Sequence, residues 1–238
     1  MLHSPKVELD SKFRLSLAET DEERDRLFEF RYKIFHQTGA LNTVQNGRFV
    51  DQYDALPSSF LLYVTNERNE ITGSVRLTVH PPADAVTDFP PTSPELAVFP
   101  DVIARFVESG VPLAGLSRLC IDPNAGQMVA ILSAVAFGAT RLGFLSGCRW
   151  LFATVIKEHQ DFYRRFAAIE SVGTERTMPF LTSPYFLGIG NLDQMVKSCV
   201  SRMPKRIVAT IEHDTNSLIE DMKDRLDLVR EAKIWPQV

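Results

Sequence analysis

The chain has 238 residues, of which 45% are hydrophobic and 24% charged, and its formal net charge is −4. This balance predicts a globular protein with one large core, and the negative charge gives no support for nucleic-acid binding. The N-terminal residues lack the apolar stretch of a signal peptide, and the apolar segment at 128–137 is too short and interrupted to cross a membrane. The three cysteines lack metal-binding spacing and are expected to be reduced thiols in a cytoplasmic protein.

The first eighty residues predict strands around one helix. Residues 13–17 alternate between apolar and polar side chains, as a strand does. Thr20 and Glu23 form a capping-box signal for a helix that ends at Gly39. Residues 40–58 are polar and irregular. Two strands follow, at 60–65 and 71–79, joined by a hairpin-like turn.

The middle of the chain opens with a proline-rich stretch. Residues 81–100 contain six prolines and no periodicity, which predicts a connection without regular structure, followed by a short helix at 103–107. A strand at 113–121 and a turn then lead into an apolar helix at about 127–145. The strongly apolar residues 148–156 predict a central strand that is covered on both faces.

The last third of the chain predicts a short helix at 159–166 and closing strands at 169–172 and 180–187. Residues 206–212 are compatible with one more strand, and 215–233 with a charged helix that carries an apolar stripe. This order predicts a mixed α/β, or α+β, sheet flanked by helices. We expect one domain at 1–200 and an extension at 201–238, whose helix packs on the domain or forms an oligomer or partner contact.

Three arginines and two aspartates lie at the ends of predicted elements that can converge. Arg76 and Arg118 each stand inside an apolar strand, where a lone charge is costly unless it is paired. Asp51 and Asp54 are either solvated turn residues or partners for these guanidinium groups and for Arg31. A guanidinium fits a carboxylate through two parallel hydrogen bonds. The second interpretation predicts an arginine–aspartate network with donors left for a polar substrate.

These motifs resemble those of the acyl-homoserine-lactone synthases and, more closely, of their relatives the N-acyl amino acid synthases. The shared pattern is an arginine with an aromatic residue four positions later, an aspartate pair, a Gly-x-x-Arg-Leu strand and a Ser-Arg pair. In this chain these are Arg31 with Phe35, Asp51 with Asp54, the strand from Gly73 to Leu77, and Ser117 with Arg118. The resemblance covers residues 31 to about 190. It implies a GNAT-type acyltransferase fold, with a mixed central sheet whose central strands splay apart.

Two departures from the lactone-synthase pattern concern the acceptor. No tryptophan occurs in residues 36–42, where those synthases use one to hold S-adenosylmethionine, and Gly115 stands where they carry a glutamate. The resemblance therefore implies an amino acid as acceptor rather than S-adenosylmethionine. Without that glutamate the general base is not assigned, and the candidates are Asp51 or Asp54, acting through water, and His36.

The resemblance also implies roles further along the chain. Tyr163 resembles the GNAT tyrosine that protonates the leaving thiol, and an aromatic anchor in the core fits the same position. The turn after the Ser-Arg strand would bind the phosphate of a pantetheine arm through backbone N–H groups at a helix start. The residues expected there are Leu119, Ile121, Asn124, Ala125, Gly126 and Gln127.

The implied reaction joins a long fatty acyl chain to the amine of an amino acid. Its donor would be an acyl-pantetheine thioester on acyl carrier protein or coenzyme A, and no tightly bound cofactor or metal is expected. Local basic residues suit docking of an acidic carrier protein. They are Arg141, Arg149, Lys157, Arg164 and Arg165, with a second group at Arg202, Lys205 and Arg206. A lactone synthase and a non-catalytic GNAT-like binding module are the alternatives.

Overall fold

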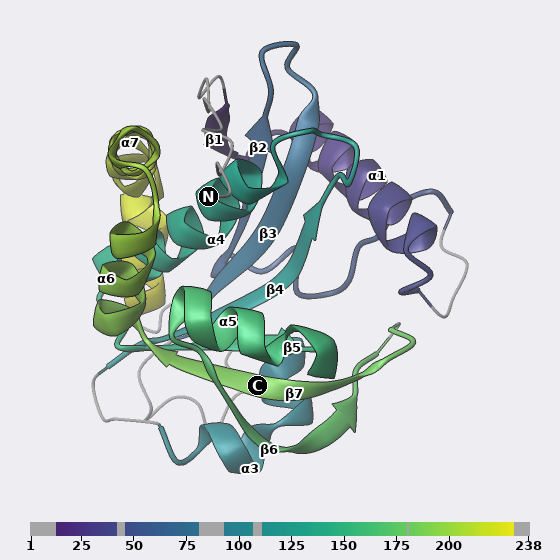
Figure 1. Cartoon of the computed structure of the whole chain (residues 1–238), viewed down its shortest axis with the longest axis vertical. Helices are drawn as coiled ribbons and strands as arrows, with labels where there is room; N and C mark the ends of the chain where they lie inside the picture. Colours follow the sequence, from purple (N-terminus) through teal and green to yellow (C-terminus); the bar gives the residue numbers. More distant parts are fainter. Residues whose placement is uncertain (1–12, 42–45, 81–92, 107–110, 180, 231–238) are drawn as a thin grey trace, which may run out of the picture.

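The computed structural model describes residues 13–41, 46–80, 93–106, 111–179 and 181–230 (Figure 1). Its centre is a seven-stranded sheet in the order β1-β2-β3-β4-β5-β7-β6. The strands are β1 (Arg14–Leu17), β2 (Ser59–Thr65), β3 (Ile71–His80), β4 (Leu113–Ile121), β5 (Trp150–Val155), β6 (Glu170–Thr177) and β7 (Pro184–Asn191). All neighbouring strands are antiparallel except β4 and β5, which are parallel. The predicted mixed sheet is confirmed.

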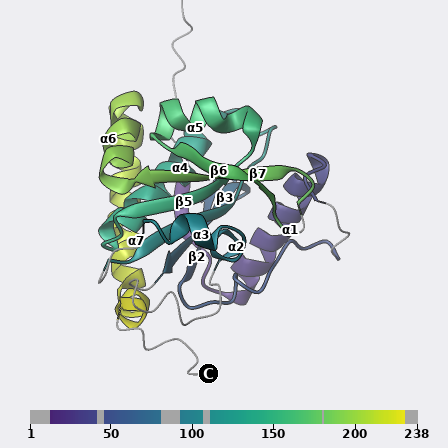
Figure 2. The ribbon, with the colours of Figure 1, turned by 90° about the horizontal axis from the view of Figure 1, so that it is seen from below.

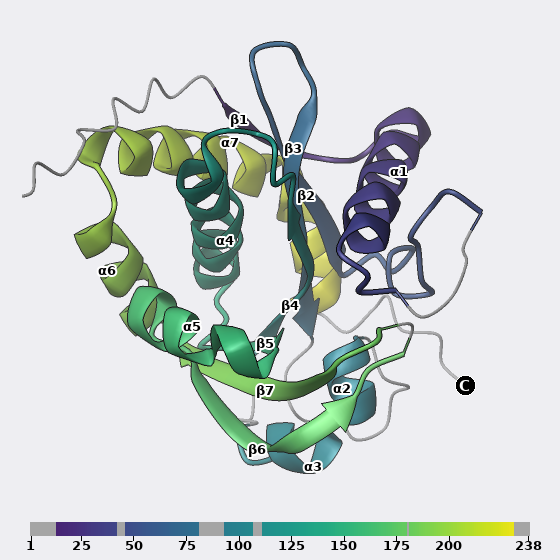
Figure 3. The same ribbon diagram turned by 45° about the vertical axis from the view of Figure 1, so that its right-hand side comes forward.

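Helices cover both faces of this sheet. They are α1 (Asp21–Gln37), α2 (Pro94–Val98), α3 (Pro100–Ile103), α4 (Met128–Leu145), the 3₁₀ turn η2 (Lys157–His159), α5 (Gln160–Ala167), α6 (Leu192–Arg202) and α7 (Lys205–Arg230). Figure 3 shows α1 on one side of β3 and β4, with α4 and α7 on the other. Figure 2, a view from below, shows α2 and α3 in front of the strands, and α2 contacts β5.

Strands β4 and β5 splay apart, as the resemblance implied. They pair only from Ala114 to Leu116 against Leu151 to Ala153, although β4 continues to Ile121. Strand β5 is buried on both faces, because Leu151 and Ala153 pack in the main core and Phe152 packs in a second core beneath α2 and α3. The divergence opens a space in the middle of the sheet.

Helix α4 is the apolar helix that lines this space. It runs for 18 residues with a mean hydropathy of 1.8, so the expectation that the segment is too short to cross a membrane was wrong about its length. Among the described residues it is the one helix long and apolar enough to do so. However, 61% of it is buried inside the fold against the sheet, which is how the core helix of a globular domain lies.

The strand predicted at 206–212 is wrong, because these residues belong to helix α7. Its buried residues recur at helical spacing and join the main core, where the helix packs on α4 and β1. They are Ile207, Ile211, Leu218, Met222, Leu226 and Val229. The β-branched residues at 207, 208 and 211 favour a strand locally, and tertiary packing overrides that preference. The proposed domain boundary at residue 200 stays a prediction.

The proline-rich stretch holds two short helices that the sequence analysis placed differently. Helix α2 starts at Pro94 behind the N-cap Ser93, and α3 starts at Pro100, so the helix predicted at 103–107 ends at Ile103 instead. Proline suits the first turn because its missing N–H has no helical partner there. Residues 81–92 lie outside the described part of the chain. Helix α6, capped by Asn191, was not predicted.

Candidate active site

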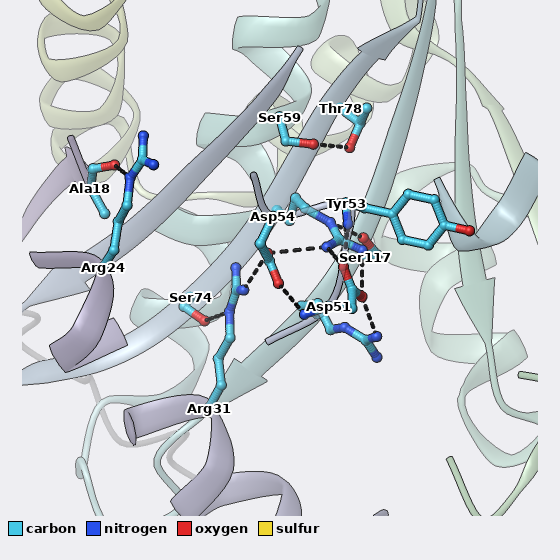
Figure 4. A network of polar contacts seen from close by, with 12 residues as sticks. Ala18, Arg24, Arg31, Asp51, Tyr53, Asp54, Ser59, Ser74, Thr78 and Ser117 are labelled. Atoms are coloured by element: carbon cyan, nitrogen blue, oxygen red, sulfur yellow. Dashed lines mark hydrogen bonds and ion pairs between the residues drawn. The ribbon is translucent and has the colours of Figure 1, made fainter. Parts of the chain in front are cut away.

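A buried network of three arginines and two aspartates lies where α1, β3 and β4 meet the loop that precedes β2 (Figure 4). Arg31 and Arg76 are fully buried. Nη1 of Arg31 donates to Oδ1 of Asp54 at 2.8 Å, and Nη1 of Arg76 lies 3.1 Å from the same oxygen. Nη1 and Nη2 of Arg76 donate to the two oxygens of Asp51 at 2.6 and 3.3 Å. The structure thus brings the predicted pairs together, and their catalytic roles stay predictions.

Both aspartates have every oxygen engaged. Asp51 also accepts from Nη2 of Arg118 and from the backbone N–H of Tyr53, and Asp54 accepts from the backbone N–H of Asp51. Burial opposes the ionisation of Asp51, but the fields of Arg76 and Arg118 outweigh it and hold its pKa at about 2. A carboxylate so firmly ionised is a poor proton acceptor at neutral pH. The interpretation of Asp51 as the general base therefore loses its support.

Arg118 differs from the other two arginines in its backbone, and like Arg31 it has a buried donor without a hydrogen-bond partner among the described residues. Its φ is +59°, a left-handed conformation that is strained for a residue with a side chain. It lies in a bulge of β4, where pairing with β3 shifts between Ser74 and Arg76. Its Nε is buried and has no hydrogen-bond partner among the described residues. Burial lowers its pKa, partly offset by Asp51. A strained, incompletely paired guanidinium is suited to a ligand.

A cavity of about 440 Å³ reaches from Arg118 into the space between β4 and β5. This is within the range of small-molecule sites. Its polar end is formed by Ser117, Arg118 and Glu95. Apolar residues from α4, α6 and β5, with the residue after β5, form much of the remaining wall, namely Leu132, Ala136, Ala153, Ile156, Met195 and Cys199. Thr140, Thr154 and His159 add polar groups to it. The cavity has the shape expected of a site for a polar head and an apolar chain.

Tyr163 from α5 lines this cavity, as its predicted role requires. Burial raises the pKa of its hydroxyl to about 12, so the group keeps its proton at neutral pH. Tyr185 from β7 lines the same space and was missed, since nothing in the sequence near residue 185 indicates chemistry. His36 is exposed and stacks on Tyr32 outside the cavity, which fits a surface residue.

The predicted pantetheine turn lies only partly at the cavity. Leu119 lines it, whereas Ala125 and Gln127 line a separate hollow beside the β2–β3 hairpin. Asn124 and Gly126 are exposed, Gly126 with a positive φ, and Ile121 is half-buried at the end of β4. Helix α4 starts without a side-chain cap, so its first N–H groups are open to an anion. The phosphate-binding role of this turn stays a prediction.

Glu95 on α2 is the functional candidate that the sequence analysis missed. Its side chain is 1% exposed, and neither carboxylate oxygen has a hydrogen-bond partner in normal geometry within the described chain. Burial raises its pKa, opposed in part by the field of Arg76. The Ser93-Pro94-Glu95 run, an N-cap followed by proline and an acid, was the available signal for a helix start here.

Residues 26–188 match the family of the N-acyl amino acid synthase FeeM. The chain belongs to this family. As a FeeM-family protein it is an acyltransferase, and the resemblance seen in the sequence is confirmed. The matched region contains the whole arginine–aspartate network, Glu95, Tyr163 and Tyr185, and it ends before α6. Comparison with curated protein sequences gives no match.

Solved structures show the same GNAT-like fold. FeeM itself, an N-acyl amino acid synthase from uncultured soil microbes, superposes with a TM-score of 0.62 at 12% identity, covering 81% of this chain and 98% of that one. BjaI, a CoA-dependent acyl-homoserine lactone synthase, gives 0.59 at 15% identity over 80% and 88%. The acyl-homoserine lactone synthase LasI gives 0.58 at 14% identity over 79% and 95%. At these identities the superpositions show the fold of the FeeM-family chain, and its substrates have to be inferred from its own residues.

Proposed function

We propose that this chain transfers a long fatty acyl group from an acyl-carrier-protein thioester to the amine of an amino acid, giving an N-acyl amino acid. The observation that carries the proposal is a buried arginine with an unpaired donor, Arg118, on the wall of a cavity that is lined mostly by apolar side chains. One end suits the carboxylate of an amino acid, and the other suits an acyl chain.

Arg118 is the arginine available to the acceptor. The guanidinium groups of Arg31 and Arg76 are buried beneath the two aspartates, whereas Arg118 lies on the cavity wall. Although each arginine contacts an aspartate, the network holds three guanidinium groups against two carboxylates, so the five side chains together carry one excess positive charge. An acceptor with a free α-carboxylate would neutralise it in the low-dielectric interior. This favours a neutral or aromatic amino acid over cationic S-adenosylmethionine.

The acyl chain would lie between the splayed strands. Ala136 and Ala153 leave the cavity open where larger side chains would fill it, and Cys199 lies on α6 at its wall. Each methylene buried there contributes about 0.8 kcal/mol, so a long chain gains most from this site.

The thioester would enter beside α5. His159 and Phe162 line the cavity and are also exposed, which places an opening there. Exposed Lys157, Arg164 and Arg165 surround it, although Arg164 pairs with Asp161. A negatively charged carrier protein would be attracted to this surface. Coenzyme A is the alternative carrier, and a structure of BjaI contains S-adenosylmethionine and isopentyl-CoA.

In the proposed reaction the neutral amine attacks the thioester carbonyl. Backbone N–H groups of β4 between Arg118 and Ile121 that do not face β3 would stabilise the oxyanion, since β4 has no β5 partner beyond Leu116. The C–S bond then breaks, and Tyr163 protonates the sulfur. No covalent enzyme intermediate is needed.

The test is product analysis with purified protein and one acyl donor on carrier protein or coenzyme A. Tyrosine, tyrosine amide and S-adenosylmethionine are offered separately, and products are identified by mass spectrometry. We expect N-acyl tyrosine, with the amide at least tenfold poorer because Arg118 would lack its counter-charge. Preference for S-adenosylmethionine would establish a lactone synthase instead. No transfer to any acceptor would establish the non-catalytic binding module.

A further inference from the structure

Gly115 and Glu95 share one space beside the cavity. A side chain at Gly115 on β4 would place its Cβ 2.9 Å from Nε2 of His80 and 3.8 Å from Oε2 of Glu95. Gly115 stands where the lactone synthases carry a glutamate. The carboxylate of Glu95, which comes from α2, lies next to this position. Helix α2 holds Glu95 in place through its Ser93 cap and Pro94.

We propose that Glu95 is the general base of this site, replacing from a helix the carboxylate that β4 lacks. The inference rests on the proposed function, because it needs an amine that attacks a thioester. Its evidence is geometric: a buried carboxylate without hydrogen-bond partners in the described chain lines the same cavity as Ser117 and Arg118.

Other described titratable groups in and around the cavity fit this role less well, and His159 lies at its exposed opening. Burial lowers the pKa of His80 to about 3, so a neutral imidazole there binds a proton too weakly. Burial raises the pKa of both Tyr163 and Tyr185, which keeps them protonated. Asp51 is held ionised by its arginines. Burial raises the pKa of Glu95 instead, toward the range in which a base takes a proton effectively at neutral pH.

The charges around Glu95 match an amino acid zwitterion. The charged groups that act on it are Arg76 from β3 and Arg118 from β4, and His80 from β3 lies on the same side of Gly115. With the acceptor carboxylate against Arg118, its ammonium group would face the ionised carboxylate of Glu95. Both ends of the substrate would then meet a group of opposite charge.

The proton steps balance over the reaction. Glu95 takes one proton from the ammonium group and releases it to solvent. The neutral amine forms the C–N bond, and the C–S bond breaks with its electron pair on sulfur. The second proton that the nitrogen loses restores Tyr163 after that hydroxyl has protonated the thiolate. The products are the amide, the free thiol and one proton.

The experiment compares wild type with Glu95→Gln, which keeps the shape of the side chain and removes the base. We expect kcat with tyrosine at pH 7 to fall roughly 10²- to 10⁴-fold, the usual worth of a general base. The loss should shrink as the pH rises toward about 9.5, because the acceptor amine is then neutral by itself. It should also be smaller at pH 7 with aminooxyacetic acid, whose nitrogen is already neutral.

Controls separate catalysis from folding. Asp101→Asn removes an exposed carboxylate on the neighbouring helix α3 and should leave kcat unchanged. Glu95→Gln should melt at the same temperature as wild type or higher, because the carboxylate it removes is buried and unpartnered. Activity within twofold of wild type, or an equal loss at every pH and with both acceptors, would overturn the role of Glu95 alone. An inactive wild type would overturn the proposed function and this inference with it.

Discussion

The guanidinium carbon of Arg118 lies 4.1 Å from the centroid of the Phe49 ring. The ring covers one face of the guanidinium while Asp51 holds one of its edges. Together they fix an arginine that the strained backbone turns into the cavity. The remaining edge, with Nε, is where a substrate carboxylate fits.

Arg118→Gln should raise KM for the amino acid at least tenfold and change KM for the acyl donor little, since only the acceptor carries the carboxylate. The preference for tyrosine over its amide should shrink in parallel. Steady-state kinetics with each substrate varied in turn measures both. Arg176→Gln is the matched control, because Arg176 also lies over an aromatic ring, Phe99 at 5.0 Å, but does not line the cavity. An unchanged preference for the acid would assign Arg118 another role.

Asp54→Ala should destabilise the protein by about 3–5 kcal/mol, because it leaves Arg31 and part of Arg76 buried without a counter-charge. Urea unfolding of both proteins provides the comparison. Asp193→Ala removes an exposed partner of Lys197 and should cost under about 1 kcal/mol. Similar losses for the two variants would mean that the buried network contributes no more than a surface pair.

Acid should weaken the fold through Asp51. Its pKa is about 2 in the folded protein and about 4 in an unfolded chain, so ionised Asp51 contributes about 2 kcal/mol above pH 4. That contribution is lost as the pH falls from about 4 to about 2. The pKa of Glu95 is raised in the fold, so its ionisation lowers the free energy of unfolding as the pH rises, opposite to the effect of Asp51. The comparison therefore uses a variant in which only Asp51 is changed. The free energy of unfolding should therefore depend less steeply on pH in Asp51→Asn than in wild type. Identical slopes would contradict the assignment.

Ala136→Phe should shorten the acyl chain that the enzyme accepts, because the ring would project from α4 into the cavity. Transfer of long chains should fall at least tenfold, and transfer of two- to four-carbon chains should persist. A donor series of increasing length tests this. Val129→Phe adds the same ring to the exposed start of α4, where Val129 is 70% exposed, and should leave the profile unchanged. Loss of all chain lengths equally would point to misfolding rather than to a blocked site.

Charge reversal at Arg165 together with Lys157 should reduce turnover with acyl carrier protein more than turnover with a minimal pantetheine thioester. Only the carrier protein presents an extended acidic surface, and the difference should fade at about 1 M salt, where the screening length is about 3 Å. The reversal of Arg68, an exposed arginine in the distant β2–β3 turn, is the control. Equal losses with both donors would locate the defect in the cavity.

The arginine–aspartate network could be predicted from the sequence because an unpaired charge inside an apolar strand is costly. Arg76 and Arg118 occur inside apolar strands, and such charges need partners, which Asp51 and Asp54 supply. Helix α1 followed from the capping box, and β1 to β5 followed from local patterns of apolar residues. Features that depend on residues close together in the sequence could therefore be predicted. The closing strands were placed less well, since β6 extends to Thr177 and β7 runs from Pro184 to Asn191.

Other features depend on tertiary packing and left no clear local pattern. The left-handed backbone of Arg118 follows from a bulge against β3, and no neighbouring glycine indicates it. Glu95 was hidden because six prolines suggested a structureless segment, and its meaning depends on Gly115, which is distant in sequence. Helix α7 was misread at its start because its apolar residues are β-branched.

Arg225, which is synthesised late, holds the backbone next to the aspartate loop, which is synthesised early. This arginine of α7 donates to the carbonyl oxygens of Pro57 and Ser59, just after the two aspartates, and lies over Phe60. The Pro57 contact spans 168 residues, which a ribosome adds in about 10–30 s. Throughout that interval the aspartate loop lacks its contact with Arg225. Once Arg118 has been made, the nascent chain contains every charged residue of the network but still lacks the helix that contacts this loop.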